Sequence, residues 1–292
     1  MVFLKKLNII AGMKTILKII PVLLIIISCQ STLNEVYDIK ALPGAHYIMY
    51  SNQTFYLISG NKVINSKKIP RVEEILKTSG YFYRKNNALF QMDENLNSQF
   101  ICKGFFRDTF NGKELILNGK KLTVIENQQK STIKLPRLYT KVYFVDETTV
   151  ILSDNSKIDL YRFDGQIQLV YTLENVTDYD IDHDNRVIYY LKSNKELMLF
   201  DINLQKNELL DTFPVDQNSL QLSENSDKIV LNSDLIITLF TISSKNILMG
   251  NEPNDCAYYD DYSNSIIFLN KNNVTFFQLN SESDNKKTIQ LY

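Results

Sequence analysis

Short runs of apolar residues recur along this chain, and each is followed by a polar turn and a second apolar run. The clearest copy reads VIYYL over 187–191, KSN over 192–194 and ELMLF over 196–200, and similar copies surround Val150 and Ile266. Apolar and polar residues alternate within several runs, which is the period of a β-strand. Asn, Asp, Ser and Gly at the turns favour the backbone conformations of tight hairpins. The pattern predicts a chain of β-hairpins.

Seven copies can be aligned on one apolar residue each, and the spacing between successive positions is 34, 34, 35, 38, 41 and 37 residues. The aligned residues are Tyr47, Tyr81, Leu115, Val150, Ile188, Ile229 and Ile266. Most units also have one apolar stretch before the aligned residue and one after the hairpin, as at 142–145 and 167–173 around Val150. This predicts four strands per unit in an all-β domain over 36–292. The stretch 72–77 has some helical spacing, but it is too short to outweigh the pattern.

Seven four-stranded units resemble a β-propeller, in which each sheet buries both faces against its neighbours. Six or eight blades stay open as alternatives because the first copy is faint. The stretch 36–42 is expected either as the innermost strand of the first blade or as an addition to the last blade. The chain has no Trp, so Trp-based repeat signatures are missing. The units are most similar to the loose YVTN, NHL and TolB-like class, by pattern only.

The beginning of the chain resembles a bacterial lipoprotein signal. From Met13, two lysines precede a nine-residue apolar run at 19–27, and the tetrapeptide at 26–29 reads IISC. This layout is typical of a secretory signal, and the run is too short for a spanning helix, which needs about 20 residues. The resemblance implies a signal peptide over 1–28, acylation of Cys29 and a lipidated tether over 29–35. Gln30, rather than Asp, then favours the outer over the inner membrane.

Charge limits the classes of partner. The segment 1–28 holds four lysines and no acid, so its removal takes the formal net charge from −1 to −5. A nucleic-acid-binding domain usually carries a strongly basic face, and none is expected here. Cys102 and Cys256 would remain after Cys29, and the repeat places them on blades that are not neighbours. We therefore expect two separate thiols.

The densest polar cluster is DYDIDHD over 178–184. Alternate carboxylates can supply oxygen ligands to calcium, and Asp178, Asp180, Asp182 and Asp184 are the candidates. An EF-hand loop starting at Asp180 would need Gly at its sixth position, where Asn185 stands. The alternative is an innermost strand whose acids share one face and have structural roles. Calcium is the one cofactor considered, and we expect no bound cofactor.

Acidic pairs also precede the hairpin in two other units, at Asp146-Glu147 and Asp260-Asp261. We expect such acids to hydrogen-bond the hairpin backbone. His183, between two Asp residues, is the better placed of the two histidines for acid–base chemistry. Adjacent aromatic residues on a strand point to opposite faces, so core packing is expected for most of them. A further set near a unit boundary is expected on an exposed binding rim, namely Tyr258, Tyr259 and Tyr262.

These features favour a lipid-anchored propeller of the bacterial cell envelope that binds protein partners. One alternative is a periplasmic or surface enzyme acting on a glycan or lactone-like substrate, with Asp180, Asp182 and His183 at its site. Another is a sensor that binds a small ligand. Catalytic residues cannot be assigned from the sequence, because none of the motifs of known hydrolases or phosphate-binding loops is present.

Overall fold

The computed structural model describes residues 37–42, 46–60, 62–77, 81–86, 88–103, 106–154, 156–163, 167–279 and 286–291. Every regular element in these ranges is a β-strand. The expected signal peptide over 1–28, Cys29 and the tether over 29–35 lie outside them. Glu35–Tyr292 forms one compact unit. Among the described residues, no helix is long and apolar enough to span a bilayer.

The strands form seven antiparallel sheets of four, each built from consecutive strands. Blades one to three comprise β1 (Asp38–Leu42), β2 (His46–Ser51), β3 (Thr54–Ser59) and β4 (Lys62–Lys68); β5 (Glu74–Lys77), β6 (Tyr81–Lys85), β7 (Ala88–Met92) and β8 (Ser98–Lys103); and β9 (Phe106–Phe110), β10 (Lys113–Asn118), β11 (Lys121–Glu126) and β12 (Gln129–Lys134). Blades four and five comprise β13 (Lys141–Phe144), β14 (Thr149–Ser153), β15 (Lys157–Phe163) and β16 (Ile167–Glu174); and β17 (Val176–Asp182), β18 (Val187–Lys192), β19 (Glu196–Asp201) and β20 (Lys206–Thr212). Blades six and seven comprise β21 (Ser219–Leu222), β22 (Lys228–Asn232), β23 (Ile236–Thr241) and β24 (Asn246–Asn251); and β25 (Cys256–Asp260), β26 (Ser265–Asn270), β27 (Asn273–Gln278) and β28 (Lys286–Gln290).

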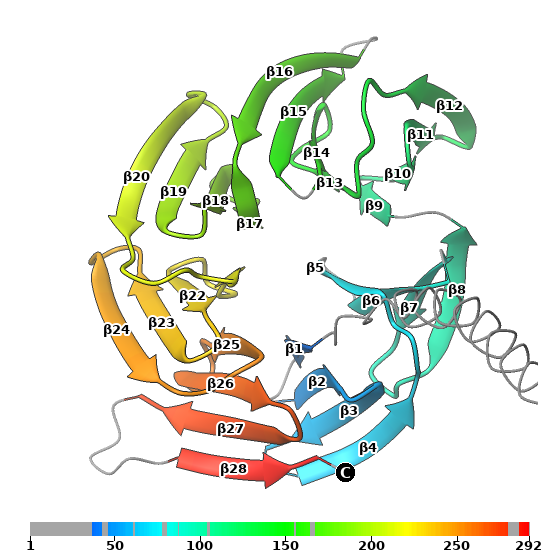
Figure 1. Cartoon of the computed structure of the whole chain (residues 1–292). Helices are drawn as coiled ribbons and strands as arrows, with labels where there is room; N and C mark the ends of the chain where they lie inside the picture. Colours follow the sequence, from blue (N-terminus) through cyan, green and yellow to red (C-terminus); the bar gives the residue numbers. More distant parts are fainter. Residues whose placement is uncertain are drawn as a thin grey trace, which may run out of the picture. The chain divides into compact units, whose positions relative to one another are not determined.

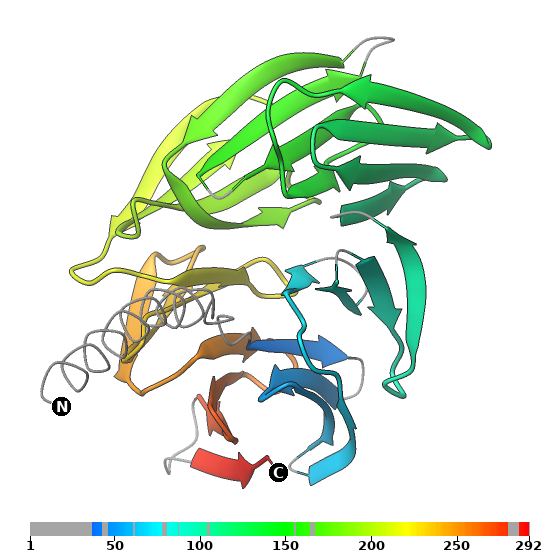
Figure 2. The same cartoon turned by 45° about the vertical axis from the view of Figure 1, so that its right-hand side comes forward.

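The sheets follow one another around a common axis, with the first strand of each blade innermost and the fourth outermost (Figure 1). Figure 2 gives a second view of the same arrangement, in which the last blade lies beside the first. The fold is therefore a seven-bladed β-propeller, and the prediction of seven four-stranded units is confirmed.

The second strand of each blade carries the repeat signal. The seven aligned residues fall on β2, β6, β10, β14, β18, β22 and β26, and each is less than 9% exposed. A second strand has hydrogen-bonded neighbours on both edges and packed blades on both faces. It therefore reads as a continuous apolar run. This is why the pattern was visible in the sequence.

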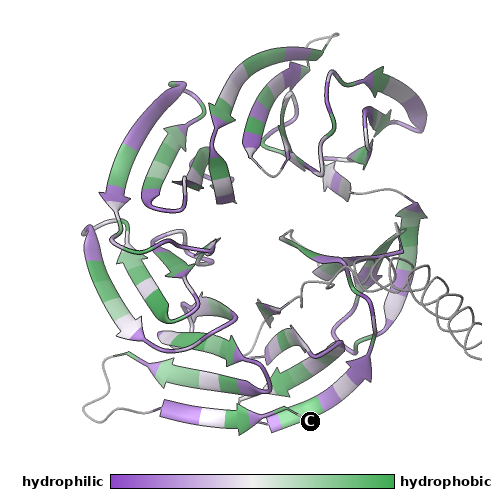
Figure 3. Ribbon diagram, in the orientation of Figure 1, coloured by the Kyte–Doolittle hydropathy of each residue, from purple (hydrophilic) through white to green (hydrophobic). Residues whose placement is uncertain are grey.

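Figure 3 shows apolar residues along the strands of the blades, and their buried side chains pack in clusters between the blades. One buried cluster runs through blades two to five. Four more clusters join blades one and two, five and six, six and seven, and seven and one. Packing between faces thus closes the ring, since no strand among the described residues is exchanged between the first and last blades.

The first strand settles the alternative left open by the sequence. Residues 38–42 form β1 and pair with β2 of the first blade, while β28 is the fourth strand of the last blade.

Polar contacts also cross the junction between the last blade and the first. Tyr47 Oη donates to Asp260 Oδ2 at 2.7 Å, and Ser51 Oγ donates to the carbonyl of Lys271.

Tight turns place several non-glycine residues at positive φ. Asn52 and Gln53 between β2 and β3 have φ of 48° and 61°, and Ser193 and Asn194 between β18 and β19 have 50° and 63°. Such pairs of positive φ angles match the twist of a two-residue hairpin.

Because the strands alternate in direction, turns between first and second strands lie on one face of the ring, here called the top face. Turns between second and third strands lie on the bottom face.

The two cysteines behave as expected. Cys102 lies on β8, the outer strand of blade two, and Cys256 on β25, the inner strand of blade seven, and no disulfide joins them. Burial raises the pKa of the Cys256 thiol well above its usual value.

Candidate functional site

The turns between first and second strands are held by the acids that precede them. Asp146 Oδ1 accepts the main-chain N–H groups of Thr148 at 2.7 Å and Thr149 at 2.8 Å. Asp260 accepts the N–H groups of Tyr262 and Ser263, both at 3.2 Å. The expectation that these acids bond the hairpin backbone is confirmed. Asp182, from the DYDIDHD segment, has the same role and accepts the N–H of Asn185 at 3.0 Å.

The same turns are also tied to the neighbouring blade. The second acid of one pair, Glu147, accepts Asn111 Nδ2 of blade three at 2.9 Å. The second acid of the other pair, Asp261, accepts the main-chain N–H of Asn225 in blade six at 2.9 Å. In blade five, Arg186 NH2 lies 2.6 Å from Asp146 Oδ2 of blade four. These bonds link the top-face turns of blades three, four and five to one another, and those of blades six and seven to each other.

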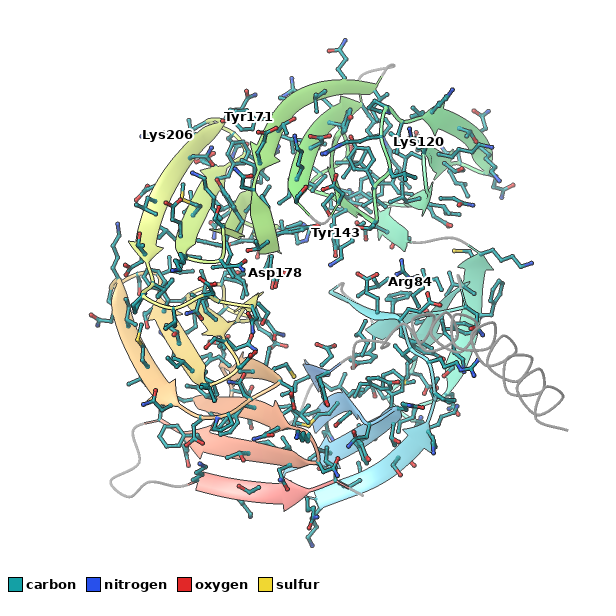
Figure 4. The ribbon with its side chains drawn as sticks, in the orientation of Figure 1. Arg84, Lys120, Tyr143, Tyr171, Asp178 and Lys206 are labelled. Atoms are coloured by element: carbon teal, nitrogen blue, oxygen red, sulfur yellow. The ribbon has the colours of Figure 1, made fainter. Side chains whose placement is uncertain are left out.

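Asp178 and Asp180 join two blades through the backbone. Asp178 Oδ2 accepts the N–H of Leu220 at 2.8 Å, and Asp180 Oδ2 accepts that of Leu222 at 3.0 Å. The donors lie on β21 and the acceptors on β17, so the carboxylates replace the sheet bonds that two separate blades cannot make. Figure 4 places Asp178 on an innermost strand near the centre of the ring. The expected shared face of these acids is therefore turned toward the next blade.

Asp108 has the same role at the junction of blades three and four, and the sequence did not single it out. Its Oδ2 accepts the N–H of Phe144 at 2.6 Å, from β9 to β13. Burial raises the pKa of Asp108, while the main-chain donors Phe144 and Thr109 lower it less. An isolated Asp in FRDTF carries no signal of this kind, because the distant strand it meets cannot be read from local sequence.

The DYDIDHD segment also lines a pocket on the top face between blades five and six. The cavity measures about 240 Å³ and is lined by Asp180, Ile181, Asp182, His183, Asp184, Leu222, Ser223, Glu224 and Ser226. His183, Asp184 and Glu224 are exposed, whereas Asp182 is 3% exposed. The described lining includes four acidic residues and one histidine, and it holds no Lys or Arg. A negative potential therefore favours a positively charged group here.

The expected calcium ligands are brought near one another, but most already have partners. Asp178 and Asp180 bond β21, and Asp182 bonds Asn185 through both its oxygens. Among the residues with described positions, no three His, Cys, Asp or Glu side chains are arranged to hold a metal ion. Calcium binding is the alternative interpretation of these acids, and a thermal-unfolding measurement tests it.

The expected tyrosine rim is wrong for two of its three members. Tyr258 and Tyr259 are each 5% exposed and pack in different clusters, Tyr258 toward blade one and Tyr259 toward blade six. Both faces of β25 are covered, so adjacent tyrosines on it are buried together. Tyr262 is 82% exposed on the following turn. It remains available for contact beside the turn that Asp260 holds.

Comparisons with known proteins support the fold. No family model and no curated protein matches the chain. Among solved structures, PorZ of Porphyromonas gingivalis aligns with a TM-score of 0.60 and 11% identity over 88% of this chain and 38% of that one. The C-terminal WD40 domain of Sif2 aligns with 0.53 and 11% over 85% and 83%. Hsv2 of Kluyveromyces lactis aligns with 0.51 and 13% over 84% and 94%. At these identities the likeness shows the propeller fold alone.

Proposed function

We propose that this chain is a protein-binding scaffold of the bacterial cell envelope, anchored by lipid on Cys29. The top-face pocket between blades five and six is its partner site. The observation that carries this proposal is a negatively charged cavity built from turns that hydrogen bonds hold in place. A rigid site loses little conformational freedom on binding, which favours affinity.

The chemistry of the pocket indicates the chemistry of the partner. Asp184 and Glu224 are exposed at its mouth, and neither carboxylate takes part in the turn bonds given above. Lys or Arg side chains of a protein segment would form charge-assisted hydrogen bonds with them. Exposed Tyr262 offers an apolar and hydrogen-bonding surface on the next top-face turn. Tyrosine is enriched at protein interfaces.

The location rests on the sequence and on analogy. The IISC tetrapeptide supports lipid attachment at Cys29, and Gln30 supports the outer membrane. PorZ is described as an essential bacterial surface component of a type-IX secretion system. This chain covers only 38% of PorZ, so that comparison supports an envelope role by analogy of architecture alone.

Partner capture from solubilised envelope tests the binding proposal. The variant Asp184→Asn/Glu224→Gln removes two charges from the pocket and should lose a partner that the unmodified chain holds in stoichiometric amount. The matched control Glu174→Gln/Asp216→Asn removes two exposed charges near the bottom face, where the side chains are 60% and 63% exposed. It should keep the partner. Equal recovery with both variants would contradict the role of the pocket.

Mass spectrometry of the N-terminal peptide tests the anchor. The proposal expects the chain taken from the membrane fraction to begin at Cys29 and to carry the added mass of two or three acyl chains. A first residue elsewhere, or an unmodified cysteine, would remove the lipid anchor while leaving the pocket proposal to its own test.

One observation supports the enzyme alternative as a second candidate function. His183 lines the same cavity as Asp180 and Asp182, as the enzyme alternative requires. A hydrolase of glycans or lactones would need His183 to exchange protons. Turnover of a glycan or lactone substrate that His183→Gln abolishes, in a chain that captures no partner, would favour this alternative over the scaffold.

A further inference from the structure

The outer strand of blade six differs from all the other outer strands of the ring. In β24, Ile247, Leu248 and Met249 are 41%, 48% and 45% exposed, and the strand holds no charged residue. Each of the other six outer strands carries at least one: Lys62 in β4, Lys103 in β8, Lys130 in β12, Glu174 in β16, Lys206 in β20 and Lys286 in β28. Charges on edge strands, lysine above all, prevent pairing with another chain. The edge of β24 lacks this protection.

The free edge of β24 is also regular. Bulges interrupt the pairing of third and fourth strands in blades one, two, four and five, whereas β23 and β24 pair without a shift. A bulge twists an edge away from other chains. A regular, uncharged edge of six residues presents an uninterrupted row of backbone groups to a new strand.

The direction of these backbone groups follows from the ladder. Ile242 N donates to the carbonyl of Asp227 at 2.8 Å, in register with the pairs of β22 and β23. In an antiparallel sheet, the N–H and C=O groups of successive residues point alternately to the neighbouring strand on one side and on the other. The main-chain groups of Ile242 point to β22, so those of Leu239 point to β24. The main-chain groups of its partner Leu248 therefore point to β23, and those of Met249 point away from β23. The N–H and C=O of Met249, and of the residues two positions on either side, are directed to the outside of the ring.

An apolar groove lies beside this edge, between blades six and seven. The cavity measures about 160 Å³ and is lined by Ile237, Leu248, Met249, Gly250, Asn251, Glu252, Ile266, Phe268 and Phe277. At Gly250, a side chain would meet no atom within 4 Å. An added strand thus finds open space for one of its own side chains opposite Gly250.

Charges flank the uncharged strand with opposite signs. Lys245 precedes β24, is 61% exposed and lies 3.5 Å from Glu208, and Glu252 follows β24, is 36% exposed and lies 2.6 Å from Lys286. Two copies of such a strand, paired antiparallel, bring the positive end of each to the negative end of the other. Self-pairing is therefore complementary in charge at both ends, and apolar between them.

We propose that two copies of this chain associate through β24, pairing antiparallel about a two-fold axis at Met249. In this register Met249 lies opposite Met249 of the second copy, and Ile247 lies opposite Asn251. The main-chain groups of all these residues point outward from their own sheets. Leu248 of the second copy then lies opposite Gly250, where the open space is. The two blades become one continuous sheet of eight strands, and the interface is isologous.

Sedimentation equilibrium of the full chain in density-matched detergent tests the proposal. A dimer is expected, and Met249→Lys should weaken it by a hundredfold or more, on the order of the effect of burying two like charges on the axis. The control Leu209→Lys places lysine at an exposed apolar position of β20, 52% exposed, and should leave the dimer unchanged. Thermal unfolding of each variant shows that the blades remain folded.

Charge reversal tests the direction of pairing. Lys245→Glu and Glu252→Lys should each weaken the dimer by about tenfold, and the combined variant should recover most of this loss. Like charges meet in the single variants, whereas opposite charges meet again in the double variant. A chain that stays monomeric at its solubility limit would overturn the proposal. So would a dimer that Met249→Lys leaves intact, or a monomer that uses this edge to bind lipid vesicles or another protein.

Discussion

Tyr47 in the second strand of the first blade donates its phenolic hydrogen to Asp260 in the last blade, across a distance of 2.7 Å. The two residues are 213 positions apart in the sequence. Burial raises the pKa of Tyr47, so the hydroxyl stays protonated and remains a donor. Asp260 also holds its own top-face turn. One carboxylate therefore links the closing junction of the ring to the rim that carries the proposed partner site.

Tyr47→Phe should lower the free energy of unfolding by about 1.5–3 kcal/mol, the usual contribution of a hydrogen bond to a charged group. Urea unfolding measures this change. Tyr189→Phe is the matched control, because Tyr189 is also buried, at 5% exposure, and no side-chain hydrogen bond of its hydroxyl is found within the described part of the chain. A loss as large in the control as in Tyr47→Phe would show that the contact with Asp260 contributes nothing.

Asp178→Ala should destabilise the ring by about 1–3 kcal/mol, because it leaves the main-chain N–H of Leu220 without its acceptor. Asp178→Asn keeps a side-chain carbonyl at that place and should cost clearly less. Urea unfolding of both variants compares them. Equal losses would mean that the negative charge, rather than the hydrogen bond to β21, is what matters.

As the pH falls, Asp146 and Asp108 should change the free energy of unfolding in opposite directions. Burial acts to raise the pKa of Asp146, but hydrogen bonds from Thr148 and Thr149 and the charge of Arg186 outweigh it and leave the pKa lowered. A lowered pKa contributes stability above the unfolded value of 3.8, and this is lost as the pH falls through the folded pKa. Burial raises the pKa of Asp108, so its contribution has the opposite sign and favours folding as the pH falls.

Asp146→Asn should therefore flatten the fall in unfolding free energy between about pH 5 and about pH 3, and Asp108→Asn should steepen it. Denaturant unfolding at a series of pH values gives both slopes. The same change of slope in both variants would contradict the assigned environments.

Calcium should leave the melting temperature unchanged. Asp178 and Asp180 already accept N–H groups of β21, and Asp182 accepts Asn185. A bound ion would have to replace these bonds. Thermal unfolding with calcium and with a chelator makes the measurement. A calcium-dependent rise that Asp182→Asn abolishes would restore the metal site that the acidic segment first suggested.

The fold could be predicted because its signal is local. In β18 every side chain but that of Lys192 is buried, and the other second strands also carry buried apolar residues, so apolar runs recur at blade spacing. Hairpin turns also carry Asn at positive φ, as at Asn52 and Asn194, and Asn tolerates this conformation. Strand pairing within a blade is sequential, and sequence order therefore gives the topology.

The site could be predicted only in part, since partners between blades are not local. Alternation placed Asp178 and Asp180 on one face, but it could not say that β21 lies against that face. It also could not tell that both sides of Tyr258 and Tyr259 are covered. The edge of β24 stands out only once its position as an outer strand is known, because the run ILMG resembles any buried strand.

Site-specific photo-crosslinking in living cells tests the central claim most directly. A photoreactive residue at His183 probes the pocket on the top face, and one at Leu235, 64% exposed on a bottom-face turn of blade six, is the control. A scaffold that uses the pocket gives one discrete adduct in the membrane fraction from position 183 and none from position 235. The absence of an adduct at 183, or the same adduct at both positions, would contradict the account.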